Sequence, residues 1–417
     1  MDRRRTAVYL IIAVSLLAGL ITGRDFFFTV AYAFLGLLVF SFFWAWSGVR
    51  WLRLPRQTRA RRAQVGNYLD EHFTVRNTGL LPKLWLEVYD HSDLPRHHAS
   101  QVISNLAPRA EAGWTAHTLC VRRGAFQLGP LRIVTGDPFG LFQSERRISA
   151  TSPLIVYPPT VDIPEFTLPI GFLPGGDAVR RRTHQITTNA AGVRDYAPGD
   201  SFSRIHWRSS ARKNRLIVKE FELDPLADVW LLMDAERTVQ VGSYDIADPE
   251  VIRRLQSAPY AVPPTTEEYT VMATASLARY FLQRDRAVGF IAHGRRREII
   301  QPERGGRQLS KILETLAVLE AWGSVTFEQL MSSYATYLPR GTTVVLVTPS
   351  TRDGWITSAH AYTQRGLRVA AVLIDGQSFG GRPGAQENAF RLAHLNITTY
   401  IVRKDDDLAM ALSQPRI

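Results

Sequence analysis

The chain has little cysteine and lacks the common catalytic sequence motifs. It has one cysteine, Cys120, in 417 residues, so it forms no internal disulfide, as is usual in a reducing compartment. It has no Walker A loop, no Gly-x-Ser-x-Gly elbow and no His-Glu-x-x-His helix, and its ten histidines are scattered. We therefore predict no catalytic residue and no enzymatic activity.

Lysine is also rare, although the chain is strongly basic. Only five of the 50 basic residues are lysine, and the formal net charge is +12. Such a charge attracts nucleic acid, but an arginine bias also follows from genomic base composition. No RNA-binding motif, zinc-finger spacing or aromatic-basic ladder accompanies it. We expect no nucleic-acid partner.

The cysteine and the one pair of adjacent histidines are expected to be structural. Residues 114–123 read as a strand, in which His117 and Cys120 face opposite sides and form no catalytic pair. Cys120 is expected in the core. His97 and His98 are expected in a solvated loop, because nothing near them in the sequence completes a metal shell.

Two apolar runs open the chain. Residues 7–22 and 26–47 approach or reach the roughly 17 to 25 residues that cross a bilayer, and only residues 23–25 separate them. This predicts a transmembrane hairpin rather than a signal peptide, since no clear small-x-small cleavage site follows the first run. Arginines cluster on both flanks and only one lies in the turn, so the positive-inside rule places both termini and the soluble body in the cytoplasm. The flanking arginines are Arg3, Arg4, Arg5, Arg50, Arg53, Arg56, Arg59, Arg61 and Arg62.

The soluble part has two patterns. Period-two runs separated by turns predict a small all-β, antiparallel sandwich. Strands alternating with helices from residue 229 onward predict a doubly wound α/β domain. Residues 239–264 form an insertion in it, either a partner-binding lip or a mobile loop. The predicted divisions are 1–52 (two-helix transmembrane hairpin), 53–63 (basic juxtamembrane linker), 64–160 (sandwich), 161–191 (linker), 192–224 (signature segment) and 225–417 (α/β domain).

Residues 192–212, GVRDYAPGDSFSRIHWRSSAR, read as a signature. Pro198 and Gly199 predict a turn, and Asp200 is positioned to cap a helix that follows. On that helix the arginines at positions 204, 208 and 212 recur four apart and predict one basic stripe for docking. We expect Arg194 to pair with Asp200, and Trp207 to be buried between the sandwich and the α/β domain.

The signature resembles the diagnostic segment of bacterial membrane proteins that carry "domain of unknown function 58". A second family-like block runs from Arg122 to Phe142 and contains Asp137-Pro138-Phe139-Gly140-Leu141-Phe142. The resemblance implies the bacterial cytoplasmic membrane, a von Willebrand factor type A-like C-terminal domain and association with MoxR-type AAA+ ATPases. The matching residues are Gly192, Arg194, Tyr196, Pro198, Gly199, Asp200, Arg204, Ile205, Trp207, Ala211 and Arg212.

In the type A family, oxygen ligands at one sheet edge hold Mg²⁺. The resemblance places Asp234, Glu236 and Thr238 there, with Asp353 from a later loop. Two serines of the family pattern are replaced by Glu236 and Thr238, and Arg237 and Arg307 would oppose a cation. Arg307 and Gln308 also stand where a ligand threonine is expected. We therefore expect a degenerate site that does not hold Mg²⁺ tightly.

The expected function is a membrane-anchored, cytoplasm-facing, non-enzymatic interaction or assembly module that works with a MoxR-type ATPase and other membrane-complex proteins. Its docking surface would be the signature helix and the strand edge, and its other partner the lipid bilayer. Two other classes remain open: an enzyme of the cell envelope, and a receptor for an anionic small molecule bound at the stripe of Arg204, Arg208 and Arg212.

Overall fold

A computed structural model of the chain describes residues 3–58, 61–167, 190–196, 205–213, 215–221, 228–257 and 260–415. It divides into two compact units. The first, the β-rich unit, comprises Met1–Pro159, Tyr244–Pro263 and Leu313–Val318. The second, the α/β unit, comprises Thr160–Ser243, Pro264–Ile312 and Leu319–Ile417.

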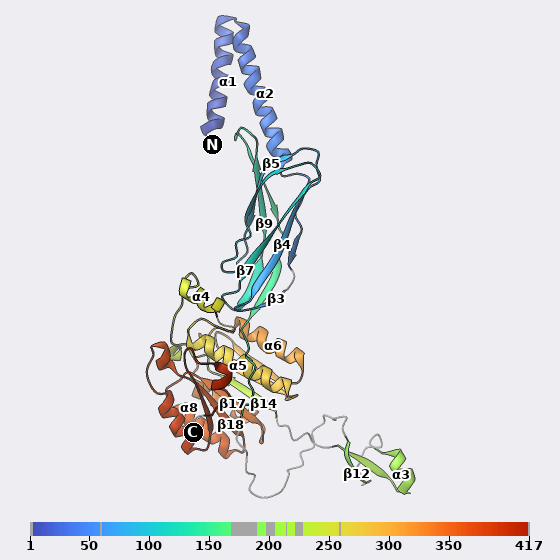
Figure 1. Ribbon diagram of the computed structural model, residues 1–417, viewed down its shortest axis with the longest axis vertical. Coiled ribbons are helices and arrows are strands. Elements are labelled where there is room, and N and C mark those ends of the chain that lie inside the picture. Colours follow the sequence, from blue (N-terminus) through green and yellow to red (C-terminus); the bar gives the residue numbers. More distant parts are fainter. Residues whose placement is uncertain are drawn as a thin grey trace. The chain divides into compact units, whose positions relative to one another are not determined.

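The β-rich unit begins with two antiparallel apolar helices, α1 (Arg3–Thr22) and α2 (Asp25–Gly48) (Figure 1). Gly23, in the turn between them, has a positive φ of 68°, which glycine adopts without strain. Both helices are long and apolar enough to cross a membrane. Many of their large apolar side chains are exposed, as a lipid-facing surface requires. The two predicted apolar helices are thus confirmed.

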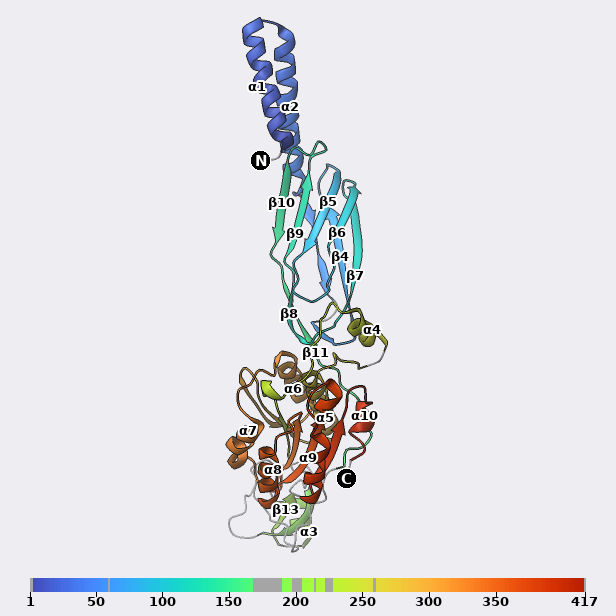
Figure 2. The same ribbon diagram turned by 90° about the vertical axis from the view of Figure 1, so that its left-hand side faces the viewer.

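Two four-stranded sheets make up most of the rest of this unit (Figure 2). One has the order β1-β4-β2 with β7 also paired to β4, and the other has the order β10-β9-β5-β6. Apolar side chains of both sheets share one core. The strands are β1 (Leu52–Arg53), β2 (Arg56–Thr58), β3 (Arg62–Gln64), β4 (Tyr68–Asn77), β5 (Lys83–Asp90), β6 (Gln101–Leu106), β7 (Glu111–Leu119), β8 (Gly124–Leu128), β9 (Leu131–Gly136), β10 (Gln143–Ile148) and β11 (Ser152–Tyr157).

The β-rich region was predicted from alternation, and the structure corrects some of its details. Strands β4 and β5 coincide with predicted runs, whereas the run at 125–136 divides into β8 and β9 at Gly129-Pro130. Strands β6 and β10 were missed, since their exposed faces interrupt the pattern. The predicted juxtamembrane linker at 53–63 is wrong as well, since it contains β2 and parts of β1 and β3. A third sheet, β3-β11-β8, contains one parallel pair, β3 with β11, so the region is not wholly antiparallel.

The insertion at 239–264 contains helix α4 (Pro249–Ser257), which belongs to the β-rich unit. Val251 and Leu255, four residues apart on one helix face, are buried in a core that includes Leu69, Cys120 and Leu154. The described part of this insertion is therefore not a loose loop, because its apolar face is packed; the partner-binding lip stays a prediction. Cys120 is fully buried, as expected.

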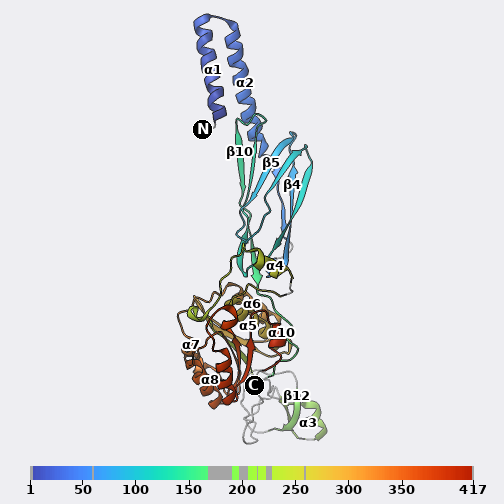
Figure 3. The ribbon, with the colours of Figure 1, turned by 60° about the vertical axis from the view of Figure 1, so that its left-hand side comes forward.

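The α/β unit contains a six-stranded sheet of order β16-β15-β14-β17-β18-β19. All neighbours are parallel except β16, an antiparallel edge strand that was not predicted. Helices α7, α8 and α9 pack on one face, and α5 also lies against the central strands (Figure 3). The strands are β14 (Val229–Met233), β15 (Val288–His293), β16 (Arg297–Glu303), β17 (Thr343–Thr348), β18 (Arg368–Ile374) and β19 (Thr398–Val402). The helices are α5 (Thr266–Gln283), α6 (Gly306–Val318), α7 (Phe327–Tyr334), α8 (Gly354–Gln364), α9 (Ala385–His394) and α10 (Leu408–Ala411), with 3₁₀ turns η2 (Arg237–Val239), η3 (Ala335–Tyr337) and η4 (Gly376–Phe379).

The start of the predicted linker at 161–191 is packed against the α/β unit. The amide of Val161 donates to Ser276 Oγ at 3.0 Å, and that of Phe166 donates to Tyr280 Oη at 2.9 Å. The ring of Phe166 stacks on Tyr400 with centroids 4.5 Å apart. Residues 160–167 therefore belong to this unit, while 168–189 lie outside the described residues.

Candidate functional site

Polar side chains gather where the central strands of the α/β sheet end. Asp234 follows β14 directly and Thr348 ends β17, and the two strands are parallel neighbours, so their carboxyl ends meet. Thr348 Oγ1 donates a hydrogen bond to Asp234 Oδ2 at 2.6 Å. The amide of Glu236 donates to Asp234 Oδ1 at 3.0 Å. Both carboxylate oxygens of Asp234 are thus engaged within the fold.

A guanidinium closes this site. Arg352 Nη1 lies 2.7 and 3.0 Å from the two carboxylate oxygens of Glu236, and Arg352 Nη2 donates to Thr238 Oγ1 at 2.9 Å. Thr238 Oγ1 also donates to Glu236 Oε1. The Glu236 side chain is 5% exposed and that of Arg352 52%, so the carboxylate is inside and the guanidinium covers it. We call Asp234, Glu236, Thr238, Thr348 and Arg352 the strand-edge cluster.

The structure brings together three of the four residues expected to be metal ligands. Asp353 is the exception, because its side chain is 67% exposed and pairs with Arg391 Nη1 at 2.6 Å. The arginine that opposes a cation is Arg352, not those singled out in the sequence. Arg237 stacks over Trp322 at 4.3 Å. The cluster does not fit Mg²⁺, because a guanidinium already occupies both oxygens of Glu236.

Gln308 and Arg307 do not supply a ligand either. Both lie in the first turn of α6, and Gln308 is fully buried. Its Nε2 donates to the carbonyl oxygens of Val288 and Gln301 at 2.6 and 2.7 Å. The side chain thus bonds the backbone of β15 and β16 instead of the strand-edge cluster.

The carboxyl of Asp234 is fully buried. Burial raises its pKa to about 7, although the hydrogen bonds from Thr348 and Glu236 oppose the rise. A carboxyl with such a pKa changes charge near neutral pH. The cluster is therefore a proton-sensitive point of the fold.

The signature segment forms a small antiparallel hairpin, β12 (Ala190–Asp195) with β13 (Ile217–Phe221), that carries the short helix α3 (Trp207–Lys213). Gly192 and Arg194 lie on β12, and the Tyr196 amide donates to the Leu216 carbonyl at 2.9 Å. The helix begins at Trp207, seven positions after Asp200, and of the expected stripe the described residues include Arg208 and Arg212. The expected turn and the expected Arg194–Asp200 pair lie outside the described residues, which exclude Pro198, Gly199, Asp200, Arg204 and the side chain of Arg194.

Trp207 is 66% exposed, which corrects the expectation that it is buried. The face of this region that meets β13 is filled by other side chains. Ile205 bridges to Val218 and is buried, and Ser210 Oγ accepts from the Ile217 amide at 2.9 Å. Arg208, Ala211 and Arg212 are exposed with Trp207. The segment therefore presents a tryptophan and two arginines to its surroundings.

The β-rich unit contains a buried charge cluster that the sequence did not reveal. Arg56 donates two hydrogen bonds to Glu71, from Nε at 2.9 Å and from Nη2 at 2.7 Å. His97 Nε2 lies 2.8 Å from Asp90 Oδ2 and 3.2 Å from Glu71 Oε2, with its side chain 1% exposed. We call Arg56, Glu71, Asp90 and His97 the β-unit network. The expectation of a solvated His97 is wrong, whereas His98 is exposed.

The β-unit network has the ligand types of a metal site but also its own cation. Atoms of Glu71, Asp90 and His97 lie within 4.8 Å of one another. The Arg56 guanidinium lies in the same group and neutralises Glu71. Burial disfavours the ionised form of Asp90, but hydrogen bonds from His97 and Ser92 and the charge of Arg56 together lower its pKa. The arrangement is that of a structural ion network.

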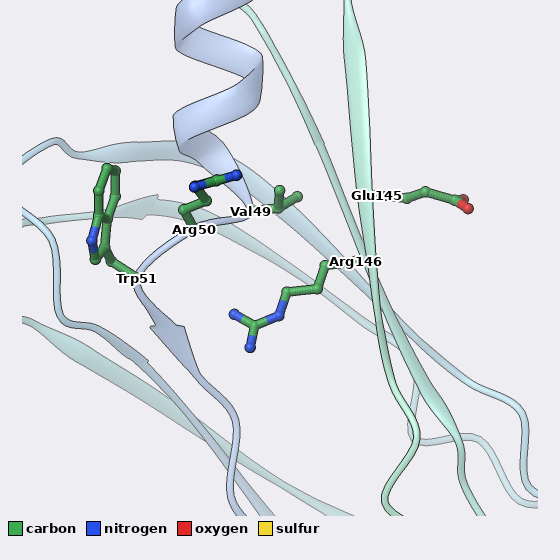
Figure 4. A pocket seen from close by; sticks show the side chains of 5 residues that line it. All are labelled: Val49, Arg50, Trp51, Glu145 and Arg146. Carbon is green, nitrogen blue, oxygen red and sulfur yellow. The ribbon is translucent and has the colours of Figure 1, made fainter.

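One pocket of about 460 Å³ opens where α2 meets the sheets of the β-rich unit (Figure 4). Val49, Arg50, Trp51, Glu145 and Arg146 line it. Figure 4 shows the Glu145 carboxylate directed away from the other four side chains. Arg146 Nη1 donates to the Leu52 carbonyl at 3.3 Å, and Arg50 stacks over Trp46 at 3.9 Å. The lining combines two arginines, one glutamate, one tryptophan and one valine and contains no recognisable catalytic pair.

Comparison with known proteins finds a family match over the signature segment and most of the α/β unit. Residues 192–378 match the family "Protein of unknown function DUF58". The predicted resemblance is confirmed over this range. "Uncharacterized protein YeaD" of Bacillus subtilis (strain 168) is 25% identical over 298 residues, covering 69% of this chain and 67% of that protein.

Two solved structures are similar to parts of the chain at low identity. The conserved hypothetical protein BatB of Bacteroides thetaiotaomicron is 12% identical with a TM-score of 0.31, covering 45% of this chain and 96% of its own. The CARDB domain of a Pyrococcus furiosus protein, solved with di-metal ions, is 13% identical with a TM-score of 0.20, covering 25% of this chain and 91% of its own. TM-scores this low do not establish a common fold.

Proposed function

We propose that this protein is a membrane-anchored, non-enzymatic interaction module whose binding surface includes helix α3. The observation that carries the proposal is the exposure of Trp207 beside Arg208 and Arg212. Tryptophan and arginine are the residue types most enriched at binding hot spots, and a tryptophan gains most when a partner removes it from water. The DUF58 match covers this segment, so the proposal concerns the part that the family shares.

We further propose that the α/β unit is a von Willebrand type A-like domain that works without a metal ion. The strand order β16-β15-β14-β17-β18-β19 with one antiparallel edge strand supports this assignment. At its strand edge, the Arg352 guanidinium takes the position in which a cation would balance Glu236. The edge would then bind a partner through hydrogen bonds and charge, not through a shared metal ligand.

The proposed partner is a MoxR-type AAA+ ATPase, with other proteins of a membrane complex. This partner class comes from the family resemblance of the signature segment, and the exposed Trp207 and Arg208 supply a surface that suits a protein partner with apolar and acidic groups. The arginines that flank α1 and α2 support an orientation with the soluble units in the cytoplasm, where such an ATPase finds its nucleotide. This orientation belongs to the proposal.

The test is binding of the purified full-length protein in detergent to the purified MoxR-type ATPase of the same organism. Trp207→Ala should weaken binding by about 30-fold or more, equivalent to at least 2 kcal/mol, because a central aromatic contact is lost. It should leave the thermal melt nearly unchanged, within about 0.5 kcal/mol, because the side chain is exposed. Phe390→Ala, at an equally exposed aromatic residue on α9, is the matched control and should change neither.

Equal affinity of the Trp207→Ala variant and the native protein would remove α3 from the binding surface. No binding of the ATPase by the native protein would contradict the partner class. Tight binding of phosphate-bearing small molecules that is lost in an Arg208→Ala/Arg212→Ala variant would favour the anionic-ligand receptor instead. Substrate turnover by the purified native protein would favour the cell-envelope enzyme.

A further inference from the structure

The turn between β9 and β10 is rigid and apolar at its tip. It contains the Asp137-to-Phe142 block that the sequence singled out and that the proposed function does not use. The buried Asp137 carboxylate accepts hydrogen bonds from the amides of Phe139 and Phe142, at 2.9 Å from Phe139, and the Asp137 amide donates to the Phe142 carbonyl. Gly140 has a φ of 68°, which closes the turn. The tip is therefore held in one conformation.

This turn lies against the two apolar helices of the same unit. Leu141 is buried in a cluster with Val8 of α1 and Leu38 of α2. The ring of Phe142 lies 5.7 Å from that of Phe42, and the Arg5 guanidinium lies 5.5 Å above the Phe142 ring. The turn thus contacts both helices in the half of the hairpin where α1 begins, at Arg3, and α2 ends, at Gly48.

Helix geometry gives the depth of these contacts. Val8 is three residues beyond Arg5 along α1, about 4.5 Å further into the apolar hairpin. From Thr6 to Thr22 the helix extends about 25 Å, close to the roughly 30 Å of a hydrocarbon core. Arg5 therefore marks the margin of the span. Leu141, which contacts Val8, reaches one helical turn past this margin.

Several large apolar side chains are exposed at this end of the unit, although Arg50, Glu145 and Arg146 are exposed there too. Phe139 at the tip is 50% exposed. In the turn between β4 and β5, Leu80 and Leu81 are exposed, and the neighbouring Thr78 amide donates to the Trp51 carbonyl at 2.7 Å. Amphipathic and aromatic side chains prefer the lipid interface, where their apolar parts leave water. We propose that the turn from Asp137 to Phe142 is a third membrane-contacting element, which inserts Phe139 into the bilayer interface beside the hairpin.

The proposal rests on the membrane anchoring proposed above, and one labelling experiment tests the two separately. The full-length protein is placed in nanodiscs of phosphatidylcholine and phosphatidylglycerol, with an environment-sensitive fluorophore on an introduced cysteine. Cys120 stays unlabelled, because it is fully buried and burial raises its pKa to about 12. The three labelled variants are Phe139→Cys at the turn, Leu35→Cys on the exposed face of α2, and Tyr68→Cys.

Tyr68 is the matched control for Phe139. It is an exposed aromatic residue of the same unit, at the opposite end of β4 from Asn77, which pairs with Leu52 just beyond α2. Nine residues of strand separate Tyr68 from Asn77, about 30 Å, which is well beyond the headgroup layer. A label at position 68 should therefore remain in water whatever the turn does.

The expected result is strong quenching of the label at position 139 by lipids that carry a spin label high on the acyl chain, with none at position 68. A water-soluble thiol reagent should modify the Phe139→Cys variant about tenfold more slowly than the Tyr68→Cys variant, as expected for interfacial burial. Quenching at position 35 together with equal behaviour at positions 139 and 68 would overturn the third contact and leave the anchor intact. No quenching at position 35 would overturn the membrane anchoring itself.

Discussion

The β-unit network and the strand-edge cluster both bury carboxylates beside an arginine, yet they differ in what surrounds the arginine. In the β-unit network the Arg56 side chain is 9% exposed, so every charge is inside. In the strand-edge cluster the Arg352 side chain is half exposed and covers the buried Glu236 from the solvent side. Breaking an ion pair that is fully buried costs much stability, whereas solvent screens the attraction within an ion pair whose arginine is exposed. The first cluster is suited to hold a fold, and the second to respond to solvent.

The largest change in stability is expected for a substitution in the β-unit network. Glu71→Ala removes the carboxylate that accepts both Arg56 hydrogen bonds and leaves the guanidinium buried with a weaker partner in Asp90. Breaking a buried pair in this way costs about 3 to 5 kcal/mol. Hydrogen exchange of the β4 amides should report the loss directly. Thr58→Ala, which removes one 2.7 Å hydrogen bond to Glu71 but no charge, is the control and should cost about 1 kcal/mol.

A loss below about 1 kcal/mol in Glu71→Ala, no larger than that of its control, would mean that water reaches Arg56. The β-unit network would then resemble the strand-edge cluster, and the contrast between the two would disappear. Loss of the exchange protection in β4 with native protection retained in β17 would instead show that the two units unfold separately.

The strand-edge cluster could be predicted because its members follow strands of a parallel sheet, where sequence position alone fixes which ends meet. This rule gives the edge itself, whereas the choice of Asp234, Glu236 and Thr238 as candidate ligands came from the resemblance to the type A family. Arg352 was missed, although it directly precedes the expected Asp353 in the same loop. Which of two neighbouring loop residues turns inward depends on backbone angles that periodicity does not give, and here the inward residue is the arginine.

The β-unit network could not be predicted, because strand register and an irregular connection bring its residues together. Thr58 pairs with Glu71 in the β2–β4 register, and Asp90 ends β5 in the other sheet. His97 then enters from a connection without regular structure. The hairpin helices, β4, β5 and the parallel strands were predictable from apolar periodicity. Trp207 was not, since an exposed and a buried tryptophan give the same pattern in a helix of seven residues.

The next effect concerns the proton on Asp234. Its pKa is about 7 in the folded protein against 3.8 as the ordinary value. Between these pH values the folded state holds a proton that the unfolded state has released, so stability should fall as pH rises, by about 1.4 kcal/mol per pH unit. Asp234→Asn keeps an acceptor for the Glu236 amide and should remove this slope. The difference between the native protein and this variant in thermal melts from pH 4 to pH 8 isolates the contribution. If the stability of the native protein and of the variant changed with pH in the same way, the Asp234 carboxyl would be reached by solvent and its pKa would be ordinary.

A smaller change in stability is expected when Arg352, which covers the strand-edge cluster, is replaced. Arg352→Ala should destabilise the α/β unit by about 1 kcal/mol, because the lost ion pair is partly exposed. It should also free both oxygens of Glu236 for a cation. Mg²⁺ at ten times its Kd would then add about 1.4 kcal/mol to the variant and little to the native protein. Arg352→Ala/Asp234→Asn should lose the Mg²⁺ response. Equal Mg²⁺ stabilisation of the native protein and Arg352→Ala would contradict the guanidinium cover.

The smallest effect should follow from Asp353, the one expected ligand that the structure places outside the cluster. Its carboxylate is largely exposed and pairs with Arg391, which Glu387 also contacts at 2.6 Å. Asp353→Ala should therefore change the stability of the α/β unit by no more than about 0.5 kcal/mol, as for other surface pairs, and leave the pH slope of Asp234 intact. Glu387→Ala, at the other partner of Arg391, is the matched control and should behave alike. A Mg²⁺ response of Arg352→Ala that disappears when Asp353→Ala is added would show that this loop turns inward once the guanidinium is removed.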